Sequence, residues 1–188
     1  RRGVLTAALS AIDVALWDLK GKFFDLPISV LLGGQNRQKV VPYATGLYFS
    51  KSHQLAKNLA EEAEHYVDQG FRAIKMKVGL SIKDDIHHIK SIRKAIGYDI
   101  SLMIDANHAY SLREALKLAR LAEPYDISWF EEPVSPEFYN QYRDLRKKTS
   151  IPIAGGECEY LRYGFLQLLK NDCLDILQLD ICASGGLT

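Results

Sequence analysis

The chain has 188 residues, which is long enough for one domain with a buried core. Its 24 basic and 23 acidic side chains nearly cancel, so no broad electrostatic field would attract nucleic acid or an anionic membrane surface. The sequence contains neither a run of 18 apolar residues nor a secretory signal pattern. Its three cysteines, Cys158, Cys173 and Cys182, lack the CxxC spacing of a metal site and suit reduced thiols. Composition therefore predicts a cytoplasmic protein that binds neither nucleic acid nor membrane.

The first segment is predicted to be a helix that leads into a loop. Apolar residues recur at helical spacing in it, at Leu5, Leu9, Ile12, Leu16 and Leu19. The helix is expected to end near Gly21. Pro27 and the pair Gly33–Gly34 then predict a loop.

From Val40 onward, short apolar runs alternate with longer amphipathic stretches. The short runs predict six strands, over 40–45, 73–78, 101–104, 128–130, 151–154 and 176–181. The longer stretches predict helices within 55–67, 82–96, 112–119, 137–147 and 161–169. Ser111 with Glu114, and Ser81 with Asp84, have capping-box spacing. Repeated strand–helix units predict an α/β fold with a parallel sheet, either an open doubly wound sheet or a closed barrel.

Charged residues at the ends of the predicted strands favour the barrel. Lys77, Asp105, Glu131, Glu157 and Asp180 follow one another at intervals of 28, 26, 26 and 23 residues. Each interval is about the length of one βα unit of a TIM-type barrel. In a barrel the C-terminal strand ends converge on one mouth, where active sites are built, whereas an open sheet would spread these residues along an edge.

Strand pleating predicts that two lysines point into this barrel. In the second predicted strand, Lys75 and Lys77 share one face, and the apolar residues share the face that would pack on helices. Buried ammonium groups are costly unless anions lie nearby. The candidate anions are the carboxylates of Asp105, Glu131 and Glu157.

By the same alternation, Gln178 and Asp180 are expected on the inward face of the last strand. Each polar residue also has a structural explanation, because a single acidic residue after a strand is usually a helix cap or a solvated loop residue. Lys75 and Lys77 could likewise lie on an edge strand that faces water. Three carboxylates and two lysines at one-unit spacing favour a functional site over these alternatives.

A set of motifs runs in order through nearly the whole chain. It comprises residues 11–22, Lys75–Lys77, Ile104–Asn107, Trp129–Pro133, Gly155–Glu157, and Asp180 followed by Gly185–Gly186. Each motif is weak by itself, whereas the ordered set is highly specific. In this set the sequence resembles the enolase superfamily, and within it the mandelate racemase/muconate lactonizing enzyme group.

The resemblance implies a Mg²⁺ ion bound by Asp105, Glu131 and Glu157, which fits the preference of a hard cation for carboxylate oxygens. The two intervals of 26 residues favour Glu131 over Glu132 as the ligand, so Glu132 would play a supporting part. Lys77 is implied to be the base that transfers a proton.

The resemblance gives three neighbouring residues roles beside that base. Lys75 would lower the pKa of Lys77 by like-charge repulsion and would contact the substrate carboxylate. Asn107 would touch the substrate. For His108, a substrate contact and a surface loop position are equally compatible with the sequence.

Two positions separate subgroups of the resembling family. Glu157 lies five residues after Pro152, as in mandelate racemase-like and acid-sugar dehydratase-like members, whereas muconate lactonizing members carry an Asp one residue earlier. Those members also have an inward Lys where this chain has Asp180. In family members, an Asp at the position of Asp180 orients a His on the seventh strand. The resemblance therefore implies that Asp180 takes part in catalysis, with a His on a strand beyond Thr188.

The resemblance covers an incomplete barrel of about six βα units. Residues 1–38 are interpreted as a helix and linker leading into the barrel, and residues 39–188 as a partial barrel catalytic domain. Most of the family's N-terminal capping domain and its last strands lie outside the sequence, which is interpreted as an excerpt of a longer protein. The resemblance also implies a homo-oligomer.

The implied reaction is Mg²⁺-dependent removal of the proton α to a carboxylate, through an enediolate. The first hypothesis is a lyase that dehydrates a sugar acid to a 2-keto-3-deoxy acid, and the alternative is a racemase or epimerase of a 2-hydroxy acid. Both act on a small carboxylate, with Tyr48 as a candidate contact. A non-catalytic barrel fragment and an aldolase with a Schiff base at Lys77 are further options, and the aldolase leaves the three carboxylates unexplained.

Overall fold

The computed structural model describes residues 3–35 and 37–188, which form two compact units. The first unit is built from segments within Arg1–Val41, Gly156–Leu169 and Gln178–Thr188, and the second from Pro42–Gly155 and Lys170–Leu177. None of the helices in the described segments is long and apolar enough to cross a membrane.

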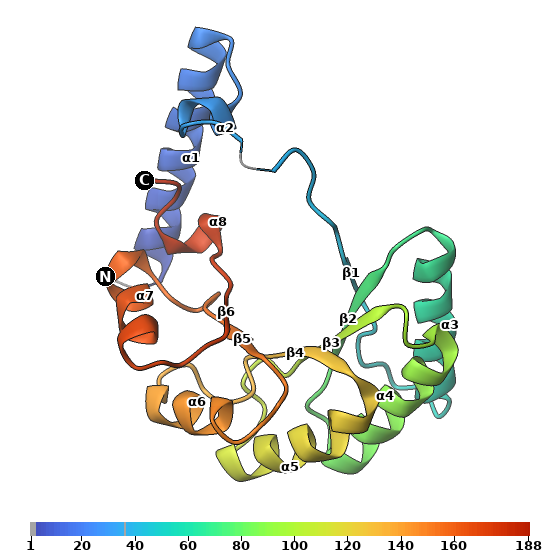
Figure 1. The fold of residues 1–188 in the computed structure, drawn as a ribbon. Coiled ribbons are helices and arrows are strands. Elements are labelled where there is room, and N and C mark those ends of the chain that lie inside the picture. Colours follow the sequence, from blue (N-terminus) through green and yellow to red (C-terminus); the bar gives the residue numbers. More distant parts are fainter. Residues whose placement is uncertain (1–2, 36) are drawn as a thin grey trace. The chain divides into compact units, whose positions relative to one another are not determined.

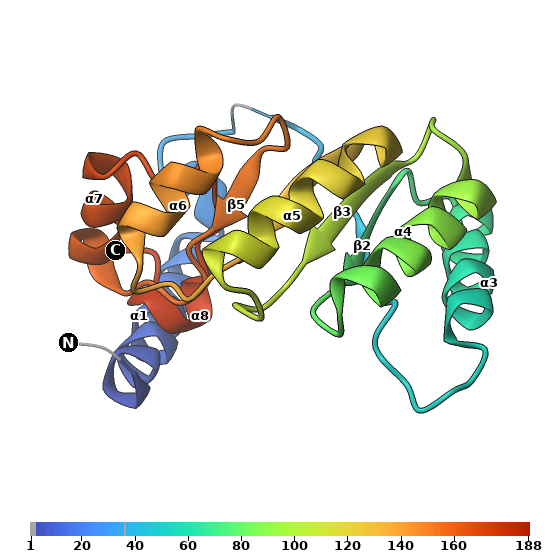
Figure 2. The ribbon, with the colours of Figure 1, turned by 90° about the horizontal axis from the view of Figure 1, so that it is seen from below.

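The second unit is a parallel sheet of six strands. They are β1 (Ala44–Thr45), β2 (Ala73–Lys77), β3 (Ser101–Asp105), β4 (Ile127–Glu131), β5 (Ile153–Gly155) and β6 (Ile176–Leu177). The strands pair in chain order, every pair parallel. The connections of this unit contain α3 (Leu55–Asp68), α4 (Ile82–Ile96), α5 (Leu112–Ala122), the short 3₁₀ helix η1 (Glu123–Tyr125) and α6 (Tyr139–Arg146). Figures 1 and 2 show these helices along the outer side of the sheet, so the predicted α/β fold is confirmed.

Side-chain caps fix where α4 and α5 begin. The Oγ atom of Ser81 accepts a hydrogen bond from the backbone N–H of Asp84 at 3.1 Å. Ser111 and Glu114 form a reciprocal capping box, in which each side chain accepts from the backbone N–H of the other residue. These bonds satisfy amide groups that the first helical turn leaves without partners. The capping box predicted at Ser111 is therefore confirmed, and Ser81 is the N-cap of α4.

Apolar side chains between the sheet and its helices form the core of the second unit. Fully buried members include Ile74, Met76, Ile89, Leu102, Ile104, Leu118 and Phe130. At the N-terminal edge of the sheet, the guanidinium group of Arg93 donates to four backbone carbonyls, those of Gly97, Ile100, Tyr125 and Asp126. Arg93 is only 2% exposed, so this end of the sheet is held by a buried cation that links α4 to the segments preceding β3 and β4.

An irregularity in β4 sets the direction of the last residue of that strand. Ile127 pairs with Leu102 and Phe130 pairs with Ile104, so β4 advances three residues where β3 advances two. Ile127 and Phe130 are both buried, on the face that the helices cover. Uninterrupted alternation would place them on opposite faces. The extra residue therefore acts as a β-bulge that turns Glu131 to the inner face.

The first unit contains α1 (Val4–Phe24), α2 (Ile28–Leu31), most of α7 (Leu161–Lys170) and α8 (Ile181–Ser184). The Oγ atom of Ser10 accepts from the N–H of Gly185 at 2.8 Å, and the Asp13 carboxylate accepts from the N–H of Leu187 at 2.6 Å. Gly186 has a φ of +94°, and an added Cβ there would collide with the Asp13 side chain. The segment 11–22 and the Gly185–Gly186 pair, which are distant motifs in the sequence, therefore contact each other.

The N-terminal helix and the first strand differ from their predicted bounds. α1 continues past Gly21 to Phe24, and its apolar stripe is 50–83% exposed in the structure, at Leu5, Leu9, Ile12, Leu16 and Leu19. β1 begins at Ala44 instead of Val40, because Val40 and Val41 are 83% and 81% exposed and have no strand pairing.

The last predicted strand, 176–181, is wrong beyond Leu177. Asp180 is instead the N-cap of α8, where its carboxylate accepts a hydrogen bond from the N–H of Cys182 at 2.8 Å. Asp is strongly preferred at the N-cap, because its side chain accepts a hydrogen bond from a backbone N–H in the first turn of the helix. Gln178 and Asp180 therefore do not share the inward face of a strand.

Candidate active site

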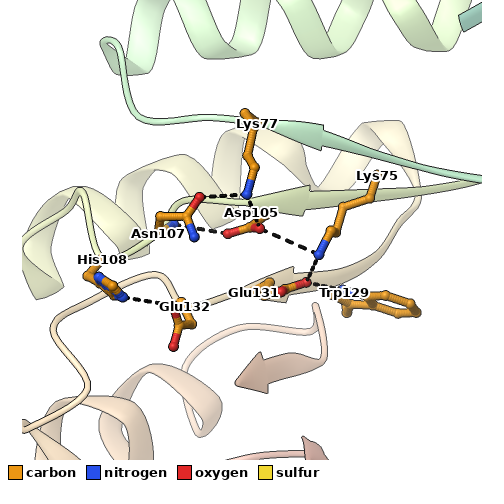
Figure 3. A network of polar contacts seen from close by, with 8 residues as sticks. All are labelled: Lys75, Lys77, Asp105, Asn107, His108, Trp129, Glu131 and Glu132. Carbon is orange, nitrogen blue, oxygen red and sulfur yellow. Dashed lines mark hydrogen bonds and ion pairs between the residues drawn. The ribbon is translucent and has the colours of Figure 1, made fainter. Parts of the chain in front are cut away.

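Two lysines and two carboxylates meet at the C-terminal ends of β2, β3 and β4 (Figure 3). The strand register places Lys77 opposite Asp105 and Asp105 opposite Glu131. The Nζ atom of Lys77 lies 2.6 Å from Oδ2 of Asp105. The Nζ atom of Lys75 lies 2.7 Å from Oε2 of Glu131 and 3.5 Å from Oδ2 of Asp105. The structure thus brings together four residues that the sequence proposed as a site.

These four side chains are shielded from water. The exposed fractions are 9% for Lys75, 17% for Lys77, 1% for Asp105 and 2% for Glu131. Burial disfavours the charged form of Lys75, but the hydrogen bond and charge of Glu131, together with Asp105, outweigh it and raise the pKa of Lys75 above its ordinary value. Lys75 is therefore held as a cation between two carboxylates.

Asn107 completes the contacts of Lys77. Its Oδ1 atom accepts a hydrogen bond from Nζ of Lys77 at 2.6 Å, and its backbone N–H donates to Oδ1 of Asp105 at 3.0 Å. Asn107 and His108 have φ values of +41° and +63°, which non-glycine residues adopt rarely. Strained backbone of this kind is concentrated at functional sites, and here it turns the Asn107 amide toward the lysine.

His108 and Glu132 form a second pair beside this cluster, as Figure 3 shows. Nε2 of His108 lies 2.8 Å from Oε2 of Glu132, and the His108 N–H donates to the Glu132 carbonyl at 2.7 Å. The Glu132 side chain is 1% exposed and the His108 side chain 32%. Glu132 therefore supports the loop that follows β3, and His108 lies at the edge of the site with its ring held.

A buried hydrogen-bond network supports the loops that carry these residues. The Asp85 carboxylate, on α4, accepts from the backbone N–H of Gly79 at 3.1 Å and from the hydroxyl of Tyr110 at 2.6 Å. Burial, reinforced by the bond to Asp85, raises the pKa of Tyr110 far above its ordinary value, so the hydroxyl keeps its proton. The network links the loop after β2 to the loop after β3.

Three aromatic residues lie around the two lysines: Tyr48, the candidate substrate contact from the sequence, and Tyr43 and Trp129, to which no role was assigned from the sequence. Nζ of Lys75 lies 5.5 Å from the ring centroid of Tyr43, and Nζ of Lys77 lies 5.8 Å from that of Tyr48. The indole N–H of Trp129 donates to Oε2 of Glu131 at 3.3 Å. The position of Trp129 two residues before Glu131 was the available signal, because such residues share a strand face.

Glu157 and Asp180 belong to the first unit. Glu157 is exposed and follows the end of β5 by two residues. Asp180 is exposed and caps α8, as described above. Their expected parts, metal ligand for Glu157 and catalytic partner for Asp180, remain predictions.

The donor chemistry of the buried carboxylates suits a hard divalent cation. Asp105 and Glu131 supply oxygen atoms only, from adjacent strand ends. Their negative charges are balanced here by Lys75 and Lys77, as buried carboxylates require positive charge nearby. Carboxylate oxygens with room for water and substrate are the ligands that Mg²⁺ prefers.

A parallel sheet with alternating helices, and with lysines and carboxylates at its C-terminal strand ends, defines an α/β barrel-type protein with a polar site. The chain matches the family described as enolase C-terminal domain-like over residues 58–188. Residues 2–33 match the N-terminal domain of the mandelate racemase/muconate lactonizing enzyme family. The chain belongs to the enolase superfamily, in its mandelate racemase/muconate lactonizing enzyme group, which confirms the resemblance found in the sequence.

Relatives of known activity include lyases and isomerases. D-galactarolactone cycloisomerase of Agrobacterium fabrum is 45% identical over 189 residues, which cover 100% of this chain and 50% of that protein. Arabinonate dehydratase of Saccharolobus solfataricus is 40% identical, with the same two coverages. The chain therefore spans about half the length of the curated relatives it matches.

Solved structures are also similar to this chain, which again covers about half of each. The 3,6-anhydro-D-galactonate cycloisomerase of Zobellia galactanivorans is similar with a TM-score of 0.95 and 62% identity, covering 100% of this chain and 52% of that chain. A racemase from Streptomyces coelicolor A3(2), with bound magnesium, has a TM-score of 0.93 and 34% identity, covering 99% of this chain and 51% of its own. The α/β architecture is thus that of the superfamily's TIM-type barrels.

Proposed function

We propose that the protein removes the proton α to the carboxylate of a sugar acid and expels the oxygen substituent on the neighbouring carbon. The observation that carries this proposal is the buried cluster of Lys75, Lys77, Asp105 and Glu131 at three adjacent strand ends. The cluster combines a candidate base, a fixed cation and two metal-type ligands, and each lysine lies within hydrogen-bonding distance of one of the carboxylates. Such a combination suits the deprotonation of a very weak carbon acid.

Mg²⁺ is the proposed cofactor, with Asp105 and Glu131 as two of its ligands and Glu157 as the third. When bound, the ion would supply positive charge that stabilises the second negative charge developing on the substrate carboxylate. Superfamily membership supports this assignment, and one similar structure is described with bound magnesium.

Lysine and polar side chains of the cluster are proposed to transfer the proton and to bind the substrate. Lys77 Nζ would accept the α-proton, and its contacts with Asp105 and Asn107 would keep that atom in place. Lys75, whose pKa is raised by Glu131 and Asp105 in spite of its burial, would stay protonated and bind the substrate carboxylate. Asn107 and His108 are proposed to contact the substrate.

Breaking the Cα–H bond leaves an electron pair that forms a carbon–carbon double bond as the C–O bond at the next carbon breaks. The leaving oxygen then takes up a proton, and Asp180 is proposed to orient the group that donates it. If that oxygen is a hydroxyl, water is lost and an enol remains. The enol loses its O–H proton and takes up a proton from solvent at the neighbouring carbon, which gives a 2-keto-3-deoxy acid, the reaction expected from the sequence.

Elimination of a ring oxygen is a second candidate. The relatives reported above at 45% and 62% identity are cycloisomerases, whose names specify a lactone and an anhydro sugar acid. In such a substrate the expelled oxygen stays attached to the molecule, so the product is an isomer of the substrate. Racemisation, the third possibility, is represented among similar structures at 34% identity.

Product masses from a sugar-acid panel test the proposal. The intact protein is incubated with Mg²⁺ and with aldonic acids, their lactones and anhydro acids, and the products are analysed by mass spectrometry and by a 2-keto acid assay. A 2-keto product lighter by one water indicates dehydration, and a 2-keto product of unchanged mass indicates ring opening. EDTA and the Glu131→Gln variant should abolish either product, whereas the exposed-site control Glu64→Gln should not. A change of configuration without a 2-keto product would contradict the elimination.

A further inference from the structure

Trp129 contacts the proposed metal ligand Glu131 directly. The Nε1–H of the indole donates to Oε2 of Glu131 at 3.3 Å, and Nζ of Lys75 donates to the same oxygen at 2.7 Å (Figure 3). The β4 bulge between Ile127 and Phe130 is what brings Trp129 and Glu131 to the inner face. Two donors therefore hold one oxygen of a carboxylate that is 2% exposed.

The indole is itself held by an aromatic contact. The rings of Tyr43 and Trp129 meet edge to face, with centroids 5.5 Å apart and an interplanar angle of 81°. Edge-to-face packing of this kind is directional and restricts the rotation of both rings. Nζ of Lys75 lies 5.5 Å from the other partner, Tyr43, so the lysine, both rings and the carboxylate form one connected set.

A carboxylate with one oxygen fixed by two donors presents its other oxygen in a fixed direction. Groups that orient a metal ligand without touching the metal typically change metal affinity by about 10–100-fold. We propose that Trp129 is a positioning residue, whose indole N–H aligns Glu131 for binding of a divalent cation. This inference rests on the proposed function, in which Glu131 binds Mg²⁺.

Calorimetric titration with MgCl₂ in the absence of substrate tests the inference, and the chain provides a matched control. Its only other tryptophan, Trp17, also donates its indole N–H to a side chain, Oγ1 of Thr188, at 3.1 Å. Trp129→Phe should raise the Kd for Mg²⁺ about tenfold. Trp17→Phe should leave the Kd within about twofold of the wild-type value.

Loss of packing is separated from loss of the N–H by an isosteric replacement. 3-Benzothienylalanine, incorporated at position 129, keeps the shape of the bicyclic ring and replaces the N–H by sulfur. The same tenfold rise in Kd is expected for it, with circular dichroism and urea unfolding like those of the wild type. If Trp129→Phe did not fold, this residue would decide the question by itself.

The outcomes distinguish the inference from the function on which it rests. A Kd for the benzothienyl protein equal to that of the wild type would overturn the positioning role of the indole N–H and leave Mg²⁺ binding intact. Equal Kd values for Mg²⁺ in Trp129→Phe and Trp17→Phe would likewise overturn the positioning role of Trp129 and leave Mg²⁺ binding intact. Absence of Mg²⁺ binding by the wild type would instead overturn the proposed function, and the inference with it.

Discussion

Replacing Lys75 by Met removes the central cation of the cluster while keeping a long, unbranched side chain. At 2.7 Å and an effective dielectric constant of about 20, the Coulomb attraction between Lys75 and Glu131 is roughly 6 kcal/mol, which offsets the cost of burying both charges. Removing one partner leaves Asp105 and Glu131 buried with Lys77 alone. Breaking a buried pair in this way costs about 3–5 kcal/mol, so Lys75→Met should lower the free energy of unfolding at pH 7 by that amount.

Urea unfolding followed by circular dichroism measures this loss. Lys57→Met is the matched control, because Lys57 pairs with Glu61 at 3.5 Å with side chains 68% and 60% exposed, and such a pair contributes less than about 0.5 kcal/mol. Saturating Mg²⁺ should reduce the difference in the free energy of unfolding between Lys75→Met and the wild type, since the ion supplies the missing positive charge. If Lys75→Met lowered the free energy of unfolding by less than about 1 kcal/mol, or by no more than Lys57→Met does, Lys75 would not be the cation that balances the buried carboxylates.

Three further variants test other parts of the structure. Lys77→Met should lower kcat by at least about 10²-fold, because the proposed base is lost, while circular dichroism and calorimetry should show a folded protein that still binds Mg²⁺. Arg93→Met should lower the free energy of unfolding in urea by about 3–5 kcal/mol, since four backbone carbonyls lose a buried charged donor, whereas Arg113→Met at an exposed site should cost less than about 0.5 kcal/mol. Burial lowers the pKa of His88 below 6.5, so the unfolded chain binds a proton more readily than the folded one as pH falls. The free energy of unfolding should therefore decline below about pH 6.5, and His88→Gln should weaken that decline while the exposed His53→Gln should not; identical pH profiles for the two variants would contradict this.

The strand–helix repeat and the lysine–carboxylate cluster could be predicted because each depends on local sequence. Lys75 and Lys77 alternate with apolar residues in a regular strand, so their common face follows directly from pleating. Asp105 ends another regular strand and meets Lys77 in register. The regular spacing of βα units then brings such strand ends to the same level of the sheet.

The β4 bulge and the helix cap at Asp180 could not be predicted, because each depends on a specific contact between residues. The bulge in β4 becomes visible only when Ile127 and Phe130 are seen to bury against the same face, and it sets the direction of both Trp129 and Glu131. Asp180 follows an apolar alternation that suggests a strand, whereas the helix cap at this residue depends on a hydrogen bond to Cys182. In both cases a contact between residues overrides the one-dimensional pattern.

Solvent isotope exchange measures whether this cluster deprotonates the α-carbon of a carboxylate. The intact protein is incubated in D₂O with Mg²⁺ and a sugar acid that the product assay has identified, and deuterium at the α-carbon of the recovered substrate and at the carbon next to the keto group of the product is followed by NMR. Deuterium incorporation should depend on Mg²⁺, and Lys77→Met should reduce its rate by at least about 10²-fold. Incorporation at the wild-type rate in Lys77→Met, or product formation without any deuterium uptake, would rule out Lys77 as the base that removes the α-proton.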